Sequence, residues 1–391
     1  MIIENSVVLM ITDADVNDGV LCLPDEATVL KADVTGISPS MRSNIKELRG
    51  KNIQYIEAFT DHCGERSSLT PTFPALELFD MPSLKEIPKE AFVQHKMLKK
   101  VELPSVKYVR EMAFEDSSIE IVILPEVRTI YESAFNFSNI NSIYAEKVEI
   151  IEDQAFDECK KLNKIHMPNV RLIGEAAFQK CNKLVRVEFA KATNIGVNAF
   201  NGCKSLEEVV LPAIQFICEM AFNNCHKLTR LRLGNDIKVI CSMVFNSCAI
   251  TELKLGKTCA ESCAFDNIQA DMDVYCDDPE QISHAPFGAY QNKGKVKNVY
   301  FKTEYTEGQK LPFLSCNECS NLVFPNRRIK ILSMMGGLVY EVMQEIPCED
   351  KVLLILRNGD YAIKNVYNIY GKIEYCSSKE ELEQALNALP F

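Results

Sequence analysis

Cys316-Asn-Glu-Cys319 is the one Cys-x-x-Cys motif in the chain, and this spacing suits a structural zinc site or a thiol redox centre. A zinc site needs four ligands, usually with a second pair at a defined spacing, and only the looser pair Cys259 and Cys263 comes near this. The motif also fits buried structural cysteines, because it coincides with the register of a repeat described below. We favour that interpretation and expect neither a bound metal nor a cofactor.

Motifs for other catalytic chemistry are missing from the sequence. There is no Gly-x-Ser-x-Gly, no Gly-rich phosphate-binding loop and no His-Glu-x-x-His. Nothing pairs a cysteine with any of the five scattered histidines, which are His62, His95, His166, His226 and His284. We therefore predict that the protein is not an enzyme.

The charge balance limits the partners that the protein can take. Among 391 residues, Lys and Arg number 43 and Asp and Glu number 54, so the net charge is −11. An acidic chain without a basic tract is a poor candidate for nucleic acid or anionic membrane binding. No apolar run approaches the roughly 20 residues that cross a bilayer, so we expect no membrane insertion.

The cysteine content bears on the compartment. The chain has 16 cysteines, and its first residues carry Glu4 and no signal-peptide cleavage pattern. A long chain without a secretion signal is expected to keep its thiols reduced. We expect free cysteines and a cytoplasmic location, with secretion or surface display as the alternative.

The strongest signal in the sequence is an Ala-Phe dipeptide that recurs at intervals of 20 to 23 residues, with Val244 in place of Ala in one copy. The phenylalanines of these copies are Phe92, Phe114, Phe135, Phe156, Phe178, Phe200, Phe222, Phe245 and Phe265. Ile or Val stands five residues before the first eight of them. Three residues after them a cysteine column runs through Cys159, Cys181, Cys203, Cys225 and Cys248, with Ser117 and Ser138 in two earlier copies.

Each copy also contains an alternating triplet that often ends in proline, as in Val101-Glu-Leu103-Pro104. Alternation indicates a short strand with one buried face, and the proline ends the strand. The Ala-Phe segment then predicts a compact 3-10 turn on the opposite face. Copies stacked about 4.8 Å apart form a parallel sheet and a continuous core. We predict a mainly β repeat solenoid.

The composite pattern Leu-x-x-Ile-x-Leu-Pro-x-Val-x-x-Ile-x-x-x-Ala-Phe-x-x-Cys resembles the BspA-like leucine-rich repeat family. The resemblance covers about residues 76–325. It implies a right-handed, curved leucine-rich-repeat array with a concave parallel sheet and a role in protein binding. The family occurs in bacterial surface adhesins and in parasite surface or intracellular proteins.

The ends of the chain depart from the repeat. We expect residues 1–58 to form an N-terminal cap with degenerate repeats, and 59–325 to form the solenoid. Residues 326–391 are expected to form a C-terminal β-rich cap or a small domain. Ser378-Lys-Glu-Glu381 is a capping box, which predicts a helix over 379–389.

Outward positions on the alternating triplets are the candidate binding residues. Most of them are charged or polar, but Ile121, Ile123 and Tyr144 form an apolar group with His166 beside them. Lys164 and Arg186 are expected at its rim. Exposed apolar groups bordered by charge often mark partner sites, although a solvated sheet surface also tolerates a few aliphatic residues.

These observations favour a non-catalytic, protein-binding repeat scaffold that uses its concave face. The alternative is a cell-surface or host-directed binding protein, either an adhesin or an effector. A third interpretation is an enzyme with its site in residues 326–391. The partner is expected to be a protein whose identity the sequence does not specify.

Overall fold

The computed structural model shows a mainly β, parallel solenoid of about 11 turns. It describes residues 1–4, 7–11, 13–35, 43–56, 60–61, 70–71, 73–256, 258–261, 263–277, 296–307, 318–334, 338–348, 351–357, 361–365 and 373–376. The chain divides into two compact units. Unit 1 contains residues 1–228 and 232–234, and unit 2 contains residues 229–231 and 235–391. The boundary falls within β24 (Arg230–Leu233).

Unit 1 begins with two small sheets, whose strand orders are β1-β2-β5-β7 and β10-β6-β4-β3. Their bounds are β1 (Ile2–Glu4), β2 (Val7–Met10), β3 (Val16–Asn17), β4 (Val20–Cys22), β5 (Val29–Thr35), β6 (Glu47–Arg49), β7 (Tyr55–Ile56) and β10 (Leu78–Asp80). A 3-10 helix, η1 (Asp13–Asp15), precedes β3, and β8 (Thr60–Asp61) pairs with β9 (Thr70–Pro71). Leu48 in β6 is the register partner of Phe79 in β10, and both are buried, so the apolar core already extends through these strands.

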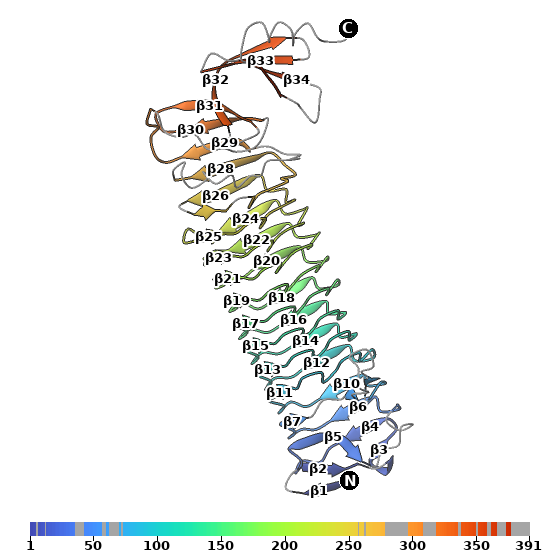
Figure 1. Cartoon of the computed structure of the whole chain (residues 1–391). Helices are drawn as coiled ribbons and strands as arrows, with labels where there is room; N and C mark the ends of the chain where they lie inside the picture. The colour runs from blue at the N-terminus through green and yellow to red at the C-terminus, as the bar shows by residue number, and fades with distance from the viewer. Residues whose placement is uncertain are drawn as a thin grey trace, which may run out of the picture. The chain divides into compact units, whose positions relative to one another are not determined.

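Each following turn of unit 1 contributes one strand to each of two parallel ladders, which form two rows in Figure 1. The long-strand ladder contains β12 (Lys100–Glu102), β14 (Ile121–Ile123), β16 (Ser142–Tyr144) and β18 (Lys164–His166), and farther along β20 (Arg186–Glu188) and β22 (Glu208–Leu211). The short-strand ladder contains β11 (Glu86–Ile87), β13 (Tyr108–Val109), β15 (Thr129–Ile130), β17 (Ile150–Ile151), β19 (Leu172–Ile173), β21 (Asn194–Ile195) and β23 (Phe216–Ile217). The sequence pattern predicted only the first of these ladders.

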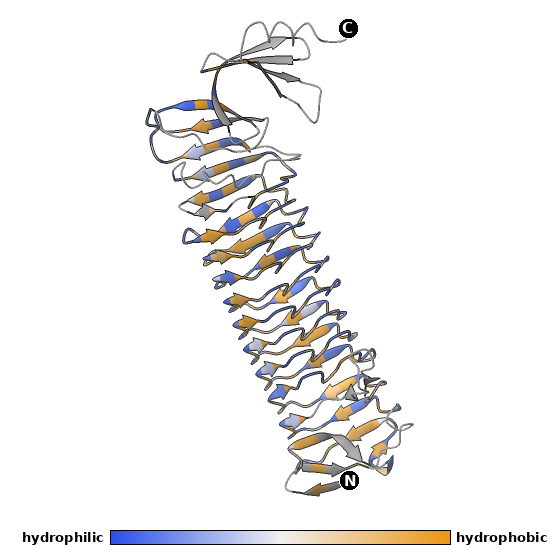
Figure 2. Cartoon of the chain, viewed as in Figure 1, coloured by the Kyte–Doolittle hydropathy of each residue, from blue (hydrophilic) through white to orange (hydrophobic). Residues whose placement is uncertain are grey.

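Alternation of side chains explains why both ladders form. In the long strands the central residue points inward, so Val101, Val122 and Ile143 are buried. Their neighbours in the strands are exposed or half-buried, except for the buried Ser142. In the short strands the second residue is the buried Ile or Val that lies five positions before each phenylalanine. Figure 2 shows this alternation of hydrophobic and hydrophilic residues along the strands of unit 1.

The phenylalanine column is the centre of the core. Phe92 to Phe222 are fully buried at every copy of the repeat in unit 1. Consecutive rings lie 5.0 to 5.1 Å apart between centroids and are nearly parallel, with interplanar angles from 1° to 12°. Stacked aromatic pairs of this kind add to the free energy of area burial.

The turns around each phenylalanine are not 3-10 helical, so that prediction is wrong. Among the described residues the only 3-10 helix is η1. Residues two positions before and two after each phenylalanine have positive φ, as at Ala176 (50°) and Lys180 (56°) around Phe178. A 3-10 helix needs φ near −60° at every residue. The glycine at this position in the next turn, Gly202 (φ 74°), adopts the same conformation without a steric penalty.

Three separate contacts set the rise per turn in unit 1. Both ladders are hydrogen-bonded sheets, in which neighbouring strands lie about 4.8 Å apart. The third contact joins the phenylalanine turns, because the Phe156 amide donates to the Ala177 carbonyl of the next turn at 2.8 Å. A curved array needs a longer repeat on one face than on the other. The in-register pairing along both ladders of unit 1 does not support the expected curvature.

Unit 2 contains both parallel and antiparallel strand pairs. Its strand β25 (Val239–Ile240) pairs in parallel with β27 (Cys259–Ala260). A second set of parallel strands comprises β26 (Glu252–Gly256), β28 (Met272–Cys276), β29 (Val296–Phe301) and β30 (Glu318–Val323). From β30 onward the pairing is antiparallel, through β31 (Arg328–Met334), β32 (Leu338–Cys348), β33 (Lys351–Leu356), β34 (Tyr361–Asn365) and β35 (Ile373–Cys376).

Some predictions fall on residues that the structure does not describe. The helix expected over 379–389 lies outside the described residues, as does Cys316 of the Cys-x-x-Cys motif. Cys319 is described as part of β30. The domain boundaries after residues 58 and 325 stay predictions.

Phe178→Ala tests the phenylalanine column. The substitution removes a fully buried ring that is stacked on Phe156 and Phe200, so we expect the free energy of unfolding to fall by about 3–5 kcal/mol. The control is Phe137→Ala, because Phe137 belongs to the same turn type but is 53% exposed. Its effect should stay within about 0.5 kcal/mol in urea denaturation. Equal effects of the two substitutions would contradict an inward-facing column.

His95 occupies the position that later turns fill with Ser or Cys, three residues after the phenylalanine. It is 1% exposed, its ring packs edge-on against Phe92 at 5.5 Å, and Nδ1 lies 3.2 Å from the Val93 carbonyl oxygen. Nε2 has no hydrogen-bond partner in the described part of the chain. Burial lowers the pKa of His95 from 6.5 to about 4, because the lost hydration of the charged ring outweighs the contacts with the backbone carbonyl groups of Val93 and Phe92, which favour the charged form.

The buried imidazole should make stability depend on pH. Between pH 6.5 and about 4 the unfolded chain binds a proton at His95 that the folded chain does not bind, so stability falls as the pH falls through this window. The full loss is about 3 kcal/mol, and it levels off below the folded pKa. His95→Ser, which copies Ser117 and Ser138, should remove this component. Urea unfolding of both proteins across the window checks it, and identical pH profiles would contradict it.

Candidate functional site

The structure brings together most of the side chains in the predicted patch. In the long-strand ladder Ile123 of β14 is the register partner of Tyr144 in β16, which in turn is the register partner of His166 in β18. Ile121, at the start of β14, is the register partner of Ser142 in β16, and Ser142 is the register partner of Lys164 in β18. We call Ile121, Ile123, Tyr144, Lys164 and His166 the strand-face patch. Its members therefore occupy three adjacent, hydrogen-bonded strands.

Exposed apolar area distinguishes this patch from its surroundings. Ile121 is 37% exposed and Tyr144 is 41% exposed, while Ile123 is half-buried. The rings of Tyr144 and His166 lie 6.5 Å apart between centroids. The preceding strand β12 presents Lys100 and Glu102 at the same positions, and these two side chains form an ion pair at 3.0 Å. The surface therefore changes from charged to apolar within one step of the ladder.

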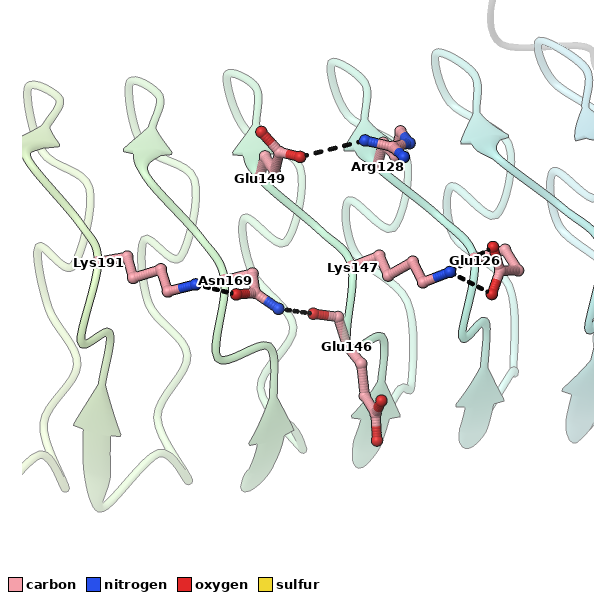
Figure 3. A network of polar contacts seen from close by, with 7 residues as sticks. All are labelled: Glu126, Arg128, Glu146, Lys147, Glu149, Asn169 and Lys191. Carbon is pink, nitrogen blue, oxygen red and sulfur yellow. Dashed lines mark hydrogen bonds and ion pairs between the residues drawn. The ribbon is translucent and has the colours of Figure 1, made fainter.

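Glu146 provides a carboxylate beside the patch that the sequence analysis did not single out. Its Oε1 lies 3.9 Å from Nε2 of His166, which is an ion pair when the imidazole is protonated. Figure 3 shows its side chain pointing away from the row formed by Lys147 and Asn169. This leaves the carboxylate of Glu146 facing the strand-face patch.

The row in Figure 3 joins consecutive turns on the segments between the long and the short strands. Lys147 donates to the Glu126 carboxylate of the preceding turn at 2.7 Å, and Lys191 donates to Oδ1 of Asn169 at 2.6 Å. Asn169 in turn donates to the Glu146 carbonyl oxygen at 2.7 Å. A second ion pair, between Arg128 and Glu149 at 3.3 Å, joins the same turns at the short strands. These exposed contacts each contribute little, but together they join four consecutive turns, from the turn of Glu126 to the turn of Lys191.

Arg186 does not join the patch as predicted. Its strand β20 belongs to another sheet, and in the described part of the chain β20 does not pair with β18. The guanidinium instead forms ion pairs with Glu188 at 2.8 Å and with the buried carboxylate of Glu208. Arg186 is therefore occupied within its own sheet.

The opening of the ladder between β18 and β20 is a feature that the sequence analysis missed. The amides of Asn163 and Lys164 donate to the Asn141 carbonyl oxygen, whereas within the described residues no such bond joins Val185 or Arg186 to Asn163. Ile165, central in β18, is only half-buried, and Val185 is 46% exposed. Extra apolar surface thus lies next to the patch.

Phe189 gives a physical reason for the opening. It takes the inward position at the end of its strand that Leu103, Leu124 and Leu211 take in other turns. Its ring is buried between Phe178 and Phe200, at centroid distances of 6.1 and 6.4 Å. A phenyl ring needs more space than these leucines, which separates the strands on this face. Phe189-Ala190 in place of Leu-Pro was the available sequence signal.

The cysteine column is structural rather than reactive. Cys159, Cys181, Cys203 and Cys225 are buried, and each thiol donates to the carbonyl oxygen of a phenylalanine at 2.9 to 3.2 Å. Burial raises the pKa of Cys159 and of Cys203 to about 12 and also raises the pKa of Cys181. Thiolates are the reactive form, so these groups are poor nucleophiles.

Two further kinds of feature are absent from the described residues. They contain no group of three or more His, Cys, Asp or Glu side chains that could hold a metal ion. They also contain no helix that is long and apolar enough to span a membrane.

Comparison with known proteins identifies the family. Residues 73–185 and 149–272 match the BspA type leucine rich repeat region, in six copies. Together these matches span residues 73–272, just over half of the chain. The chain therefore belongs to the BspA-type leucine-rich repeat family. No curated protein sequence matches it.

Solved structures with a similar fold include several bacterial leucine-rich repeat proteins. The T. pallidum protein TpLRR is 28% identical, with 41% of this chain and 72% of that chain covered and a TM-score of 0.32. A protein from Bacteroides ovatus is 16% identical, with coverages of 73% and 87% and a TM-score of 0.35. The pneumococcal vaccine antigen PcpA is 14% identical, with coverages of 68% and 80% and a TM-score of 0.31.

Thiol labelling tests the cysteine assignment. In the folded protein at pH 8, iodoacetamide should modify the exposed Cys22 and leave Cys159, Cys181 and Cys203 unmodified, because these three thiols are buried and protonated. After denaturation without reductant all 16 cysteines should react. Mass spectrometry of the labelled peptides gives both results. Labelling of the column in the folded state, or a shortfall after denaturation, would contradict buried free thiols.

Proposed function

We propose that the protein is a non-catalytic scaffold that binds another protein through the long-strand face of unit 1. The observation that carries this proposal is the strand-face patch, in which Ile121 and Tyr144 are exposed on adjacent strands of a regular ladder. Charged pairs such as Lys100 and Glu102 cover the equivalent positions one strand earlier. Surface aromatic and aliphatic groups within a charged surrounding are typical of interaction sites.

The rigidity of the ladder supports the same function. Every strand of the patch is hydrogen-bonded to its neighbour in register, and the side chains below it are packed in the core. A preorganised surface loses little conformational entropy when a partner binds. Tyr144 also offers a large contact area and a hydroxyl group with few rotatable bonds, as binding hot spots do.

The proposal includes a cytoplasmic location. Five described cysteines carry free thiols, which fits a reducing compartment: Cys22, Cys159, Cys181, Cys203 and Cys218. The alternative is a secreted or surface protein that acts as an adhesin or effector. Fractionation of the native cell, with antibody detection in intact and opened cells, separates the two locations.

Site-specific photocrosslinking tests the binding face. Benzoylphenylalanine placed at Tyr144 should capture a partner protein in the native cell, whereas the same group at Ile150 should not. Ile150 is a matched control because it is 36% exposed but lies in the short-strand ladder. Capture at Ile150 alone, or at neither position, would contradict the assigned face.

Tyr144→Ala tests how much the Tyr144 side chain contributes to the free energy of binding the partner. With the captured partner purified, the substitution should weaken binding by about 2 kcal/mol, because a central aromatic contact is lost. Thermal stability should hardly change, since the ring is on the surface. Glu102→Ala, two strands away on the same face, should leave the affinity unchanged. Calorimetric titration of the three proteins measures this, and an equal effect of both substitutions would contradict the patch.

A further inference from the structure

A group of exposed lysines lies on unit 1 near the strand-face patch. The bend that leads from each buried cysteine to the next long strand contains two solvent-facing positions. In the turns of Phe156, Phe178, Phe200 and Phe222 these positions hold Lys160-Lys161, Asn182-Lys183, Lys204-Ser205 and His226-Lys227. None of the eight residues is acidic. We call Lys161, Lys183, Lys204 and Lys227 the lysine stripe.

The lysine stripe is not neutralised by the protein itself. All four side chains are exposed, and the described residues provide no ion pair to any of them. The lysines of earlier turns behave differently, since Lys96 pairs with Asp116 and Lys147 pairs with Glu126. In the neighbourhood of the stripe Glu158 is shared by Lys160 and Lys180, and the half-buried Glu207 follows Lys204 by three residues.

The geometry of the solenoid concentrates this charge. Consecutive turns are 5.0 to 5.1 Å apart at the phenylalanine column, so equivalent positions recur at about that distance. Lys161 and Lys183 hold equivalent positions in neighbouring turns, and Lys227 holds the same position two turns later, while Lys204 stands one position earlier in the intervening turn. Like charges on consecutive turns repel one another and raise the local positive potential. This occurs on a chain whose net charge is −11. A complementary anionic partner would relieve the repulsion.

We propose that the lysine stripe binds an extended acidic polypeptide segment. Like side chains of an extended strand recur about every 6.6 Å on one face, and the flexible lysine stems can span the difference from the repeat of the turns. The described turns of the stripe expose no phenylalanine, tyrosine or tryptophan on which nucleic acid bases could stack.

This inference rests on the proposed function, because it assigns a chemistry to part of the protein partner. Lys164 links the two surfaces. It is exposed in β18 as a member of the strand-face patch, and it follows Lys161 by three residues. A partner with apolar side chains and an adjoining acidic segment would contact both surfaces at once.

Fluorescence anisotropy with a labelled oligoglutamate peptide tests the stripe on the full chain. We expect salt-sensitive binding that becomes about tenfold weaker when Lys161, Lys183, Lys204 and Lys227 are all changed to Gln, as the loss of several exposed ion pairs predicts. The control changes Lys96, Lys99, Lys107 and Lys147 to Gln, which alters the net charge equally. This control should retain affinity within about twofold. Circular dichroism verifies that both variants are folded.

Further measurements distinguish an acidic polypeptide from other anionic ligands of the lysine stripe. Equal loss in both lysine variants, or no binding of oligoglutamate, would overturn the proposal. Tighter binding of a heparin oligosaccharide or of a single-stranded oligothymidylate would also overturn it, because the occupant would not be a polypeptide. Tyr144→Ala should leave oligoglutamate binding unchanged. Failure of photocrosslinking at Tyr144 would therefore refute the proposed function without altering the result for the stripe.

Discussion

The stacking of one phenylalanine ring on the next, at a nearly constant distance, is the constraint on which unit 1 depends. The rings are fully buried and almost parallel, so each turn must repeat the path of the turn before it. The hydrogen bonds from the phenylalanine amides of six turns, from Phe92 to Phe200, to the next turn enforce the same repeat on the backbone. The two strand ladders then follow at their natural spacing, and the three contacts agree with one another.

Because the turns repeat regularly, the position of a residue within its copy of the repeat determines where it lies on the surface. A residue type that recurs at the same place in consecutive copies becomes a continuous column on the surface. The apolar patch on β14 and β16, and the lysines after the cysteine column, arise in this way from residues about 22 positions apart in the chain. Because every column is supported by a packed core, function can vary in the outward residues without disturbing the fold.

Two turns differ from the others because a residue departs from the repeat pattern. Phe189 replaces a smaller side chain and accompanies the opening of the long-strand ladder between β18 and β20. His95 replaces Ser or Cys and leaves a buried nitrogen without a partner in the described residues. Both changes put a larger or more polar group where the column provides space for a small one. The first lies near the exposed Val185 and the half-buried Ile165 beside the strand-face patch, and the second makes the core sensitive to protonation.

The sequence by itself determined the repeat, the buried columns and the central residues of the patch. An apolar residue that recurs every 20 to 23 positions can be buried only if the copies stack, and the alternation around Val122 and Ile143 decides which neighbours face solvent. Only the tertiary structure decided the rest. A two-residue strand such as β17 is too short to show alternation. The positive φ of Ala176 and Lys180 is imposed by contacts between turns, since neither residue favours it. The pairing of Arg186 with Glu208 likewise depends on which strands lie close together in space.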